Sequence, residues 1–461
     1  MTTLRENQTA PRGAGDAQAA LAEPGKRLAI AAVLGAMVLV VLNAAVANVA
    51  LPSIADSLEV PAGRAVWIVT AYQVALLMAL LPCAALGERW GYRRVFRGGV
   101  ALFSLATLLC ALAPALRWLV AARILQGLGG AAVMSLGMAL LRRVVPVSRL
   151  GTAIGWNAMA VALSSAAGPA IGAAILSTAS WPWLFALHLP LGVLVLLVSR
   201  QLPAGEGSGA GVEPWSVLLH AGTCVTLVAG VACFPEQAQP GVLLLLLAAL
   251  QLGLLVRREL PRSSPMIPFD LLGSGPFRLS VIASVSCFAG QSAAMVALPF
   301  YLQDGLGQGP LMVGLYMLPW PLTVACGAPF VGRLAGRWST AWLCGGGGAL
   351  LSTGLAASAI CPLQGSLWLL VPFTMLCGLG FSLFNVANNR NMLLSAPLQR
   401  SGAAGGLQST ARLLGQTGGA VLMTLLFSTL ANDAAARSGL AVGAALTLLA
   451  GLISLRQHGG D

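Results

Sequence analysis

Long apolar runs separated by short polar segments make up most of this chain. Each run is close to the roughly 20 residues that an α-helix needs to cross a bilayer. Helices can cross lipid because they satisfy their own backbone hydrogen-bonding groups. We therefore predict an all-α membrane protein with fourteen transmembrane helices, over residues 28–52, 65–86, 96–115, 118–141, 151–178, 184–200, 215–233, 240–256, 277–301, 310–333, 341–361, 367–391, 402–429 and 436–455.

A weak internal repeat indicates how these helices are organised. The VALP of residues 49–52 recurs at 296–299, and the LGERW of residues 86–90 recurs in part at 334–338, at nearly the same spacing. Two parallel halves around a central site are typical of transporters that rock between two states. We predict an N-terminal tail at 1–27, a six-helix half at 28–202, a linker with two inserted helices at 203–276, a second six-helix half at 277–456 and a short C-terminus at 457–461.

Composition excludes the soluble classes of protein. Of the 461 residues, 57% are apolar and 9% are charged, whereas a soluble domain carries about 25% charged residues. So few charges cannot cover a water-soluble surface. The nine cysteines contain no CxxC pair and fall in or beside the apolar runs, which favours small buried side chains over disulfides or a metal site. We expect no cofactor and no metal.

The net charge of +12 is explained by topology, because the basic residues cluster in loops between apolar runs and not along one soluble face. With fourteen helices, 21 of the 26 basic residues fall on the side of the two termini and three on the other side, Arg64, Arg117 and Arg437. Such asymmetry places the richer side in the cytoplasm. We expect both termini to be cytoplasmic, in the inner (plasma) membrane, with a lipid bilayer as partner and no nucleic acid.

The loop after the second predicted helix, residues 84–94 (AALGERWGYRR), contains a candidate gate. Its glycines allow a tight turn, and an acid there can pair with an arginine or with a helix N-terminus across the two halves. The plainer alternative is a basic loop that only fixes topology. The candidate gating residues are Gly87, Glu88, Arg89, Gly91, Arg93 and Arg94.

Two predicted helices carry further motifs. Residues 123–127 (RILQG) place Arg123 inside a helix, and a guanidinium is costly at membrane depth. It is therefore a functional candidate, although it could instead bond backbone carbonyls in a structural role. Residues 164–173 (SSAAGPAIGA) combine small residues, which pack helices closely, with a proline, which bends a helix. The residues concerned are Ser164, Gly168, Pro169 and Gly172.

Together these motifs resemble the major facilitator superfamily. The loop is similar to its G-x-L-x-D-R-x-G-R-R signature, with Ala84, Glu88 and Tyr92 as departures, and residues 123–127 resemble a motif whose arginine is associated with proton coupling. Residues 164–173 resemble the G-x-x-x-G-P-x-x-G-G of antiporters. Residues 42–52 and 181–192 are similar to segments of the fourteen-helix drug:proton antiporters. The resemblance implies the major-facilitator fold and proton-driven drug efflux, with Arg123 in proton coupling.

One departure bears on the substrate. Asn43 stands where that family has an acid, and none of the fourteen acids of this chain falls at a predicted helix centre. A buried carboxylate usually meets a cationic substrate, and proton coupling commonly needs a titratable group. We therefore expect neutral, zwitterionic or anionic small molecules over permanent cations. His188 is a candidate proton-coupling group, since histidine titrates near neutrality; a packed, neutral histidine is the alternative.

A central cavity is expected between spans 28–52, 65–86, 118–141, 151–178, 277–301, 310–333, 367–391 and 402–429. Aromatic and amide side chains suit loosely specific, mostly apolar ligands, although amides can also form interhelical hydrogen bonds. The candidate cavity residues are Asn43, Asn48, Tyr72, Gln73, Gln126, Asn157, Gln291, Tyr316, Trp320, Asn385, Asn388, Gln408, Arg412 and Gln416.

Three functions are compatible with the sequence to different degrees. The first is a monomeric, proton-coupled efflux antiporter for drugs or other small amphipathic molecules. The second keeps the fold but exports one metabolite, such as a self-made antibiotic, and Asn43 favours it slightly. The third, a membrane-embedded enzyme, is disfavoured because the three histidines are far apart in the sequence and no buried acids accompany them.

Overall fold

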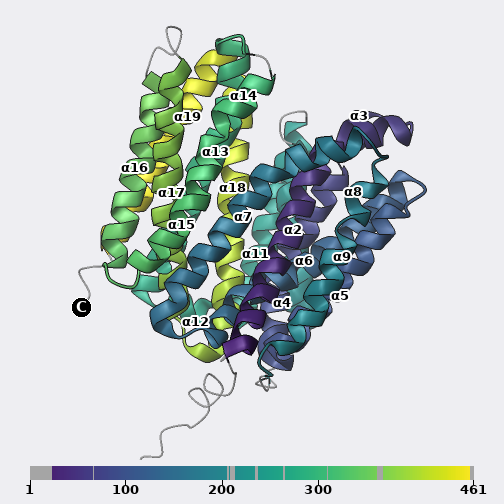
Figure 1. The fold of residues 1–461 in the computed structure, drawn as a ribbon, viewed down its shortest axis with the longest axis vertical. Coiled ribbons are helices and arrows are strands. Elements are labelled where there is room, and N and C mark those ends of the chain that lie inside the picture. Colours follow the sequence, from purple (N-terminus) through teal and green to yellow (C-terminus); the bar gives the residue numbers. More distant parts are fainter. Residues whose placement is uncertain are drawn as a thin grey trace, which may run out of the picture.

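The computed structural model describes residues 23–65, 67–204, 207, 213–233, 237–262, 265–308, 310–360 and 367–456. In these residues the chain forms α-helices with short 3-10 and π turns, and no strand (Figure 1). Most of the predicted tail, part of the linker, the C-terminus at 457–461 and the side chain of Asn48 lie outside the described residues. The all-α membrane fold predicted from the apolar runs is confirmed.

The helices fall into two halves and an insertion. The first half contains α2 (Glu23–Ser57), α3 (Ala62–Ala65), α4 (Trp67–Trp90), α5 (Tyr92–Ala111), α6 (Leu116–Val144), α7 (Val147–Leu176), α8 (Pro182–Ala186), α9 (Leu189–Val198) and η1 (Ser199–Gln201). The insertion contains α10 (Pro214–Cys233) and α11 (Ala238–Glu259), followed by the short α12 (Phe269–Leu272). The second half contains α13 (Gly275–Phe300), η2 (Tyr301–Gly305), α14 (Pro310–Met317), α15 (Pro319–Leu334), α16 (Thr340–Ile360), η3 (Leu367–Leu369), α17 (Leu370–Leu394), η4 (Leu398–Arg400), α18 (Ser401–Thr429) and α19 (Asn432–Leu455).

Thirteen helices of the described chain are long and apolar enough to cross a membrane. The fourteenth, α18, has 29 residues but does not reach that level of hydropathy. It carries Gln408, Arg412 and Gln416, and these side chains line an internal cavity. A helix whose polar positions face a cavity does not expose them to lipid, so α18 can be less apolar than its neighbours and still span.

Two spans contain interruptions that the hydropathy pattern does not predict. Residues 184–200 are divided between α8 and α9 at Leu187 and His188, just before Pro190. Residues 310–333 are divided between α14 and α15 at Leu318, just before Pro319. A proline lacks the N–H that would continue a helix, so it sits naturally in the first turn of a new one.

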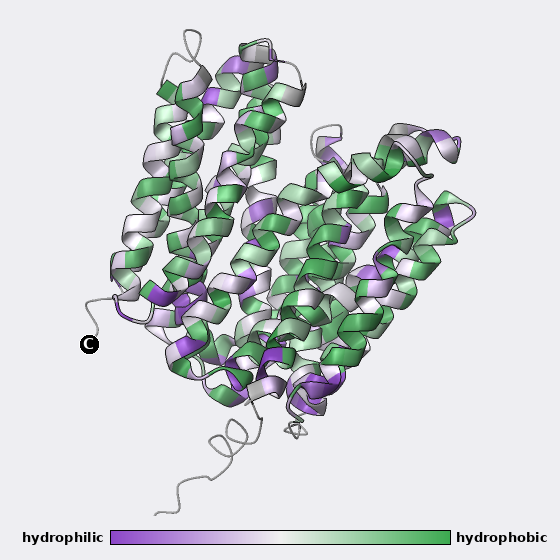
Figure 2. Ribbon diagram, viewed as in Figure 1, coloured by the Kyte–Doolittle hydropathy of each residue, from purple (hydrophilic) through white to green (hydrophobic). Residues whose placement is uncertain are grey.

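The two halves meet at one end of the molecule and diverge at the other (Figure 1). They are joined by α7 against α15 and by α18 against α4 and α6. We call the joined end the basic end, because Arg89, Arg142, Arg333 and Arg400 all lie at the helix ends there. Figure 2 shows hydrophilic residues gathered at this end. Figure 1 shows α3, which contains Arg64, at the opposite end, and Arg117 and Arg437 are near the starts of α6 and α19.

Close backbone contact and a shared core hold the basic end together. A side chain at Gly151 of α7 would collide with the carbonyl of Gly332 in α15. Small residues at such positions let backbones approach and bury surface that bulkier residues would hold apart. One buried apolar cluster runs through both halves, with Leu136 and Met138 of α6 joined to Ala403 of α18. The two halves therefore form one packed unit at this end.

The inserted helices pack on each other, and α10 also contacts α4. An ion-pair cluster joins them at the basic end, where Glu213 pairs with Arg258 and Arg262. The hydrogen bond from Arg258 lowers the pKa of Glu213 to about 2, so this carboxylate stays charged at neutral pH. The insertion is thus attached to the first half through α10.

Candidate functional site

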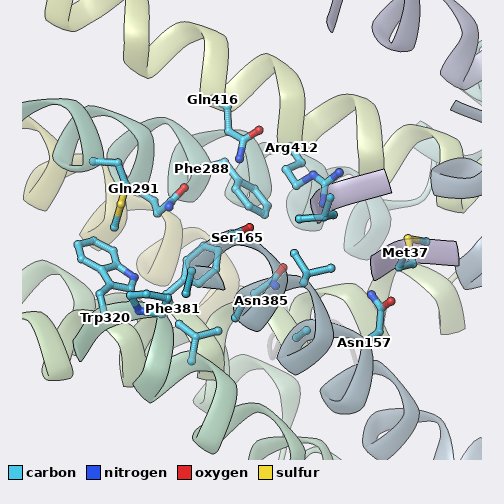
Figure 3. Close-up of a pocket in the computed structure, with 18 of the residues that line it drawn as sticks. Met37, Asn157, Ser165, Phe288, Gln291, Trp320, Phe381, Asn385, Arg412 and Gln416 are labelled. Carbon is cyan, nitrogen blue, oxygen red and sulfur yellow. The ribbon is translucent and has the colours of Figure 1, made fainter. Parts of the chain in front are cut away.

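A cavity of about 440 Å³ lies between the two halves. Its lining comes from α2, α6 and α7 of the first half, and from α13, α14, α15, α17 and α18 of the second. These are the predicted spans except 65–86, since α4 contributes no lining residue. Figure 3 shows the side chains converging from several helices. A site built from both halves can change its exposure when the halves move relative to each other.

The cavity wall combines amides, aromatic rings and methionines. Phe288 and Phe381 form an edge-to-face pair with ring centroids 5.5 Å apart. Five methionines supply flexible, polarisable surface, which adapts to ligands of different shape: Met37, Met134, Met138, Met295 and Met317. Among the lining residues Arg412 is the one charged side chain. The site is therefore apolar and adaptable, with a single fixed positive charge.

Seven of the fourteen predicted cavity residues line this cavity, six do not, and one has a side chain that is not described. Those that line it are Asn157, Gln291, Trp320, Asn385, Gln408, Arg412 and Gln416. Asn43, Tyr72 and Gln126 belong instead to a buried cluster around Arg123, and Asn388 of α17 donates to the carbonyl of Ser280 in α13. Tyr316 packs edge-on against Trp368, Gln73 is exposed outside the lining, and the side chain of Asn48 is not described.

Sequence reasoning missed the apolar part of the wall. The methionines, Phe288 and Phe381 have no polar signal, because an apolar residue in a membrane helix faces lipid as readily as a cavity. Ser165 and Asn389 also line the cavity. These two polar residues could have been found from their positions beside the quoted motifs.

Arg123 is fully buried in the first half, where uncharged groups surround it. Its Nη1 donates to Asn43 Oδ1 at 2.9 Å and to Gln126 Oε1 at 2.5 Å, and its Nε donates to the Ile68 carbonyl at 3.0 Å. The guanidinium carbon lies 4.2 Å from the centre of the Tyr72 ring. Oriented dipoles and a π face therefore compensate this charge. None of the ion pairs between described residues includes Arg123.

His188 lies in the same region, at the break between α8 and α9. Its Nδ1 is 2.7 Å from the Leu184 carbonyl oxygen, and its Nε2 is buried with no hydrogen-bond partner in the described structure. The centre of the Phe185 ring, three residues before His188, lies 6.0 Å from the guanidinium carbon of Arg123. A histidine with one nitrogen held and the other free has capacity to accept a proton.

The helix motif of residues 164–173 packs α7 against α2. A side chain at Gly168 would collide with Ala45 of α2, so the glycine sets the distance between these helices. Ser164 donates to its own helix, at the Ala160 carbonyl, and Gly172 is buried. Pro169 lines the cavity. The motif thus shapes the cavity wall where the two helices touch.

At the basic end Glu88 bridges the two halves. Its Oε2 accepts a hydrogen bond from Arg400 Nη1 at 2.5 Å, and its Oε1 accepts one from the backbone N–H of Ala403 at 2.8 Å. Ala403 is in the first turn of α18, so Glu88 satisfies a free N–H and opposes the positive end of the helix dipole. These are the two kinds of contact expected for this acid.

The rest of the gating loop contributes less directly. Gly91 has φ +93°, a conformation that side chains rarely adopt, and it joins α4 to α5. A side chain at Gly87 would meet Leu136 of α6 at 2.5 Å. Arg89 stacks on the Trp90 ring, Arg93 is half-buried, and Arg94 is exposed. Gly91 and Gly87 therefore shape the turn that presents Glu88.

Several closure residues were not predicted. Tyr92, noted only as a departure from the motif, donates to the Gln399 carbonyl and accepts from the N–H of Gly402, both at 2.9 Å. Arg142 donates to Ser401 Oγ at 2.9 Å. Arg400 also forms a two-point pair with Asp270 of α12, at 2.8 and 2.9 Å. These partners are distant in sequence, so no local pattern indicates them.

Comparison with known proteins now decides the family. The profile described as Major Facilitator Superfamily matches residues 33–420. The chain belongs to the major facilitator superfamily. It is 39% identical over 436 residues to the uncharacterized transporter YebQ of Escherichia coli (strain K12), covering 94% of this chain and 95% of that one. The membership confirms the family indicated by the sequence motifs.

Other members of the superfamily extend the comparison. The chain is 26% identical to the riboflavin transporter RibZ of Clostridioides difficile (strain 630), over 84% of this chain and 85% of that one. It is 30% identical to the multidrug resistance protein Stp of Mycobacterium tuberculosis (strain CDC 1551 / Oshkosh), over 84% of this chain and 73% of that one. This chain is thus a multi-pass membrane transporter.

The fold agrees with a solved member of the superfamily. The crystal structure of the human organic anion transporter MFSD10 (TETRAN) matches with a TM-score of 0.69 and 14% identity, over 93% of this chain and 99% of that one. At that identity the likeness concerns the fold alone. The major-facilitator architecture is therefore established by sequence and by structure.

Proposed function

We propose that this protein is a proton-coupled efflux antiporter of the inner (plasma) membrane. It works as a monomer and exports small amphipathic molecules. The observation that carries the proposal is a cavity between two halves that are joined at the basic end through Glu88, Arg400 and α18. The excess of arginine at that end supports its assignment to the cytoplasm. The relation to a multidrug resistance protein supports export over uptake.

Alternating access follows from this arrangement. With the basic end joined, the cavity communicates with the opposite side of the membrane, and cargo is released there. Separation of α7 from α15 and of α18 from α4 and α6 would open the cavity to the cytoplasm. Glu88 is the gating acid, since its two bonds to the second half break in that motion.

Proton coupling is assigned to the region of Arg123 and His188. Asn43 holds the place of the family's acid and cannot titrate, whereas His188 has a free Nε2 within the same buried region. Protonation of His188 would place a second positive charge near Arg123, and repulsion between the two favours rearrangement of the first half. The driving proton therefore acts on a histidine in place of a carboxylate.

Inside-out membrane vesicles with an imposed proton gradient test the antiport. Neutral, anionic and cationic compounds are added in turn, and collapse of the gradient is read with a pH-sensitive dye. Neutral or anionic compounds should collapse the gradient in wild-type vesicles and fail to do so with Arg123→Ala. Arg123→Lys, which keeps the charge but not the planar donor geometry, should give intermediate rates. A gradient that persists with every compound contradicts the proposal.

The second candidate is an exporter of one metabolite. The replacement of the family's acid by Asn43 favours it, because a broad cation exporter would retain a negative charge. The sequence similarity to a riboflavin transporter is compatible with export of one substrate and with export of many. The same vesicles separate the two functions: a dedicated exporter responds to one chemical class in a panel of unrelated compounds, and a multidrug exporter responds to several.

A further inference from the structure

Arg412 is the one charged side chain among the residues that line the cavity, and none of the ion pairs between described residues includes it. Its Nη2 lies 3.6 Å from the sulfur of Met134, which is a weak acceptor. Its Nε is buried and has no hydrogen-bond partner in the described structure. A guanidinium keeps its proton under all ordinary conditions, so the positive charge is permanent.

The contrast with Arg123 indicates that Arg412 awaits a ligand. Arg123 is fully buried and is not among the lining residues; its Nη2 has no hydrogen-bond partner in the described structure, but its Nη1 and Nε donate to three oxygen acceptors and the Tyr72 ring covers its face. Arg412 is partly accessible, and the space that it reaches is the cavity. Burying a charge is costly unless it is paired and hydrogen-bonded. A bound anion supplies both the charge and the acceptors that Arg412 lacks.

The neighbouring side chains define the rest of the ligand. Figure 3 places Trp320 and Phe381 toward one end of the cavity and Arg412 toward the other, with Phe288 and Asn385 between them. Aromatic side chains favour planar apolar groups, which stack on them or meet them edge-on. A ligand that fits this arrangement has an aromatic body and an anionic group at one end.

We propose that the cavity selects aromatic monoanions, with Arg412 as the specificity-determining residue. A carboxylate of the ligand accepts two parallel hydrogen bonds from the guanidinium, and its ring lies against Phe288, Phe381 and Trp320. The assignment rests on the proposed function for its role in export. It narrows the substrate class from neutral, zwitterionic or anionic molecules to one group of anions.

Permanent cations are excluded by the same charge. No aspartate or glutamate is among the residues that line the cavity. A quaternary ammonium ligand would place a second positive charge near Arg412 with no lining carboxylate to offset it, and like charges repel. The site therefore ranks an anion above the matched neutral ligand, and the neutral ligand above the cation.

Equilibrium dialysis with the purified full-length protein in lipid nanodiscs tests this ranking. The ligands share one ring system: 2-naphthoate, 2-naphthamide and (2-naphthylmethyl)trimethylammonium, each corrected for uptake by empty nanodiscs. We expect 2-naphthoate to bind at least tenfold more tightly than 2-naphthamide and the ammonium compound to bind most weakly. Arg412→Gln should abolish the preference for the acid over the amide, and Arg412→Lys should retain part of it.

Arg257→Gln provides the matched control, because Arg257 is exposed in the last turn of α11 and is not among the residues that line the cavity. It removes one positive charge and should leave the tenfold ratio unchanged. Arg412→Gln protein is compared only if it is monodisperse on size exclusion, and the Arg412→Lys variant keeps the test informative if it is not. Equal affinities for acid and amide, tight binding of the ammonium compound, or no binding of any of the three would overturn the proposal.

Binding is measured without a proton gradient, so it is independent of the antiport test. If 2-naphthoate binds through Arg412 but no compound collapses the gradient in vesicles, the antiport function fails and the anion site stands. If the gradient collapses with neutral compounds while 2-naphthoate and 2-naphthamide bind equally, the anion site fails and antiport stands.

Discussion

Arg123 shows how a membrane helix can bury a full positive charge without a counter-ion. Asn43, Gln126 and the Ile68 carbonyl each direct an oxygen at the guanidinium, and the Tyr72 ring covers one face. Charge-assisted hydrogen bonds are stronger than neutral ones, and the low local dielectric strengthens them further. Gln126 is itself held by a hydrogen bond from its Nε2 to Thr107 of α5, at 2.7 Å. The charge therefore ties α2, α4, α5 and α6 together.

Removal of the Asn43 amide should destabilise this network. Asn43→Ala leaves one Arg123 donor without its acceptor, at a cost of about 1–3 kcal/mol in the free energy of unfolding. We expect a lower melting temperature for the purified protein, measured by the fluorescence of a thiol-reactive dye or by light scattering. Gln73→Ala removes an exposed amide on the neighbouring helix and should melt like the wild type. An unchanged melting temperature for Asn43→Ala contradicts a structural role of this contact.

Single residues could be predicted from the sequence where their chemistry is unusual for a membrane. Arg123 and Arg412 are conspicuous in apolar helices, and Glu88 follows from the loop motif. The amides are different. Asn43 and Gln126 were expected in the cavity, because an amide beside a buried arginine and an amide beside a ligand have the same pattern in the sequence. Only the packing of α2 against α6 separates them.

At the scale of helices, the junction between α4 and α5 is set by one backbone conformation. Gly91 has φ +93° and is the residue just before Tyr92, the first of α5. This turn orients the last residues of α4, including Glu88, toward α18. With ψ +132°, Gly91 has a sparsely populated conformation that costs residues other than glycine about 1–3 kcal/mol.

Gly91→Ala should therefore destabilise the protein by about 1–3 kcal/mol and weaken the closure at the basic end. Gly98→Ala is the matched control: Gly98 lies in α5, and an added Cβ meets nothing within 4 Å. Because alanine is the better helix former, Gly98→Ala should be neutral or stabilising by up to about 1 kcal/mol. Thermal unfolding of both proteins in detergent measures the difference. Similar melting temperatures would show that the turn tolerates a side chain.

Helix positions were predictable because a long apolar run has few alternatives in lipid. The breaks at His188 and Leu318 were not, since a hydropathy window averages over a single interrupted turn. For α18 the span itself was predicted, but the reason for its composition was not. Its run was recognised by length in spite of Gln408, Arg412 and Gln416, but the reason for these polar residues became clear only with the cavity.

For the whole molecule, closure of the basic end depends on a few polar contacts over a packed apolar base. The side chains of Glu88 and Arg400 are 8% and 15% exposed, so their pair is shielded from solvent. Arg400 also holds Asp270 of α12, which follows the inserted helices along the chain. The closure thus involves both halves and the segment that connects them.

Glu88→Gln should shift the protein toward the state that is open at the basic end. Loss of the charge removes the pair with Arg400 and the interaction with the start of α18, together about 1–2 kcal/mol. The rate at which a membrane-impermeant maleimide, added at the basic end, labels an Asn157→Cys reporter in the cavity should rise roughly tenfold. Labelling of the native cysteines is subtracted with protein that lacks the reporter.

Arg257→Gln serves as the comparison for that experiment, because it removes a charge from an exposed position in the last turn of α11, outside the gating loop. It should label at the wild-type rate. Equal labelling of the Glu88→Gln and wild-type proteins would mean that the apolar contacts alone keep this end closed, and Glu88 would then have no gating role.

The course of α18 has a mechanical consequence. Its first turn, at Ser401–Ala403, is held by Glu88, and Arg412 lies further along the same uninterrupted helix. Eleven residues of α-helix span about 17 Å, so the two sites are linked by a short, rigid stretch of helix. A ligand that displaced Arg412 would move α18 as a whole and so strain the hydrogen bond between its first turn and Glu88. Ligand binding in the cavity and opening of the basic end would then be coupled mechanically through α18.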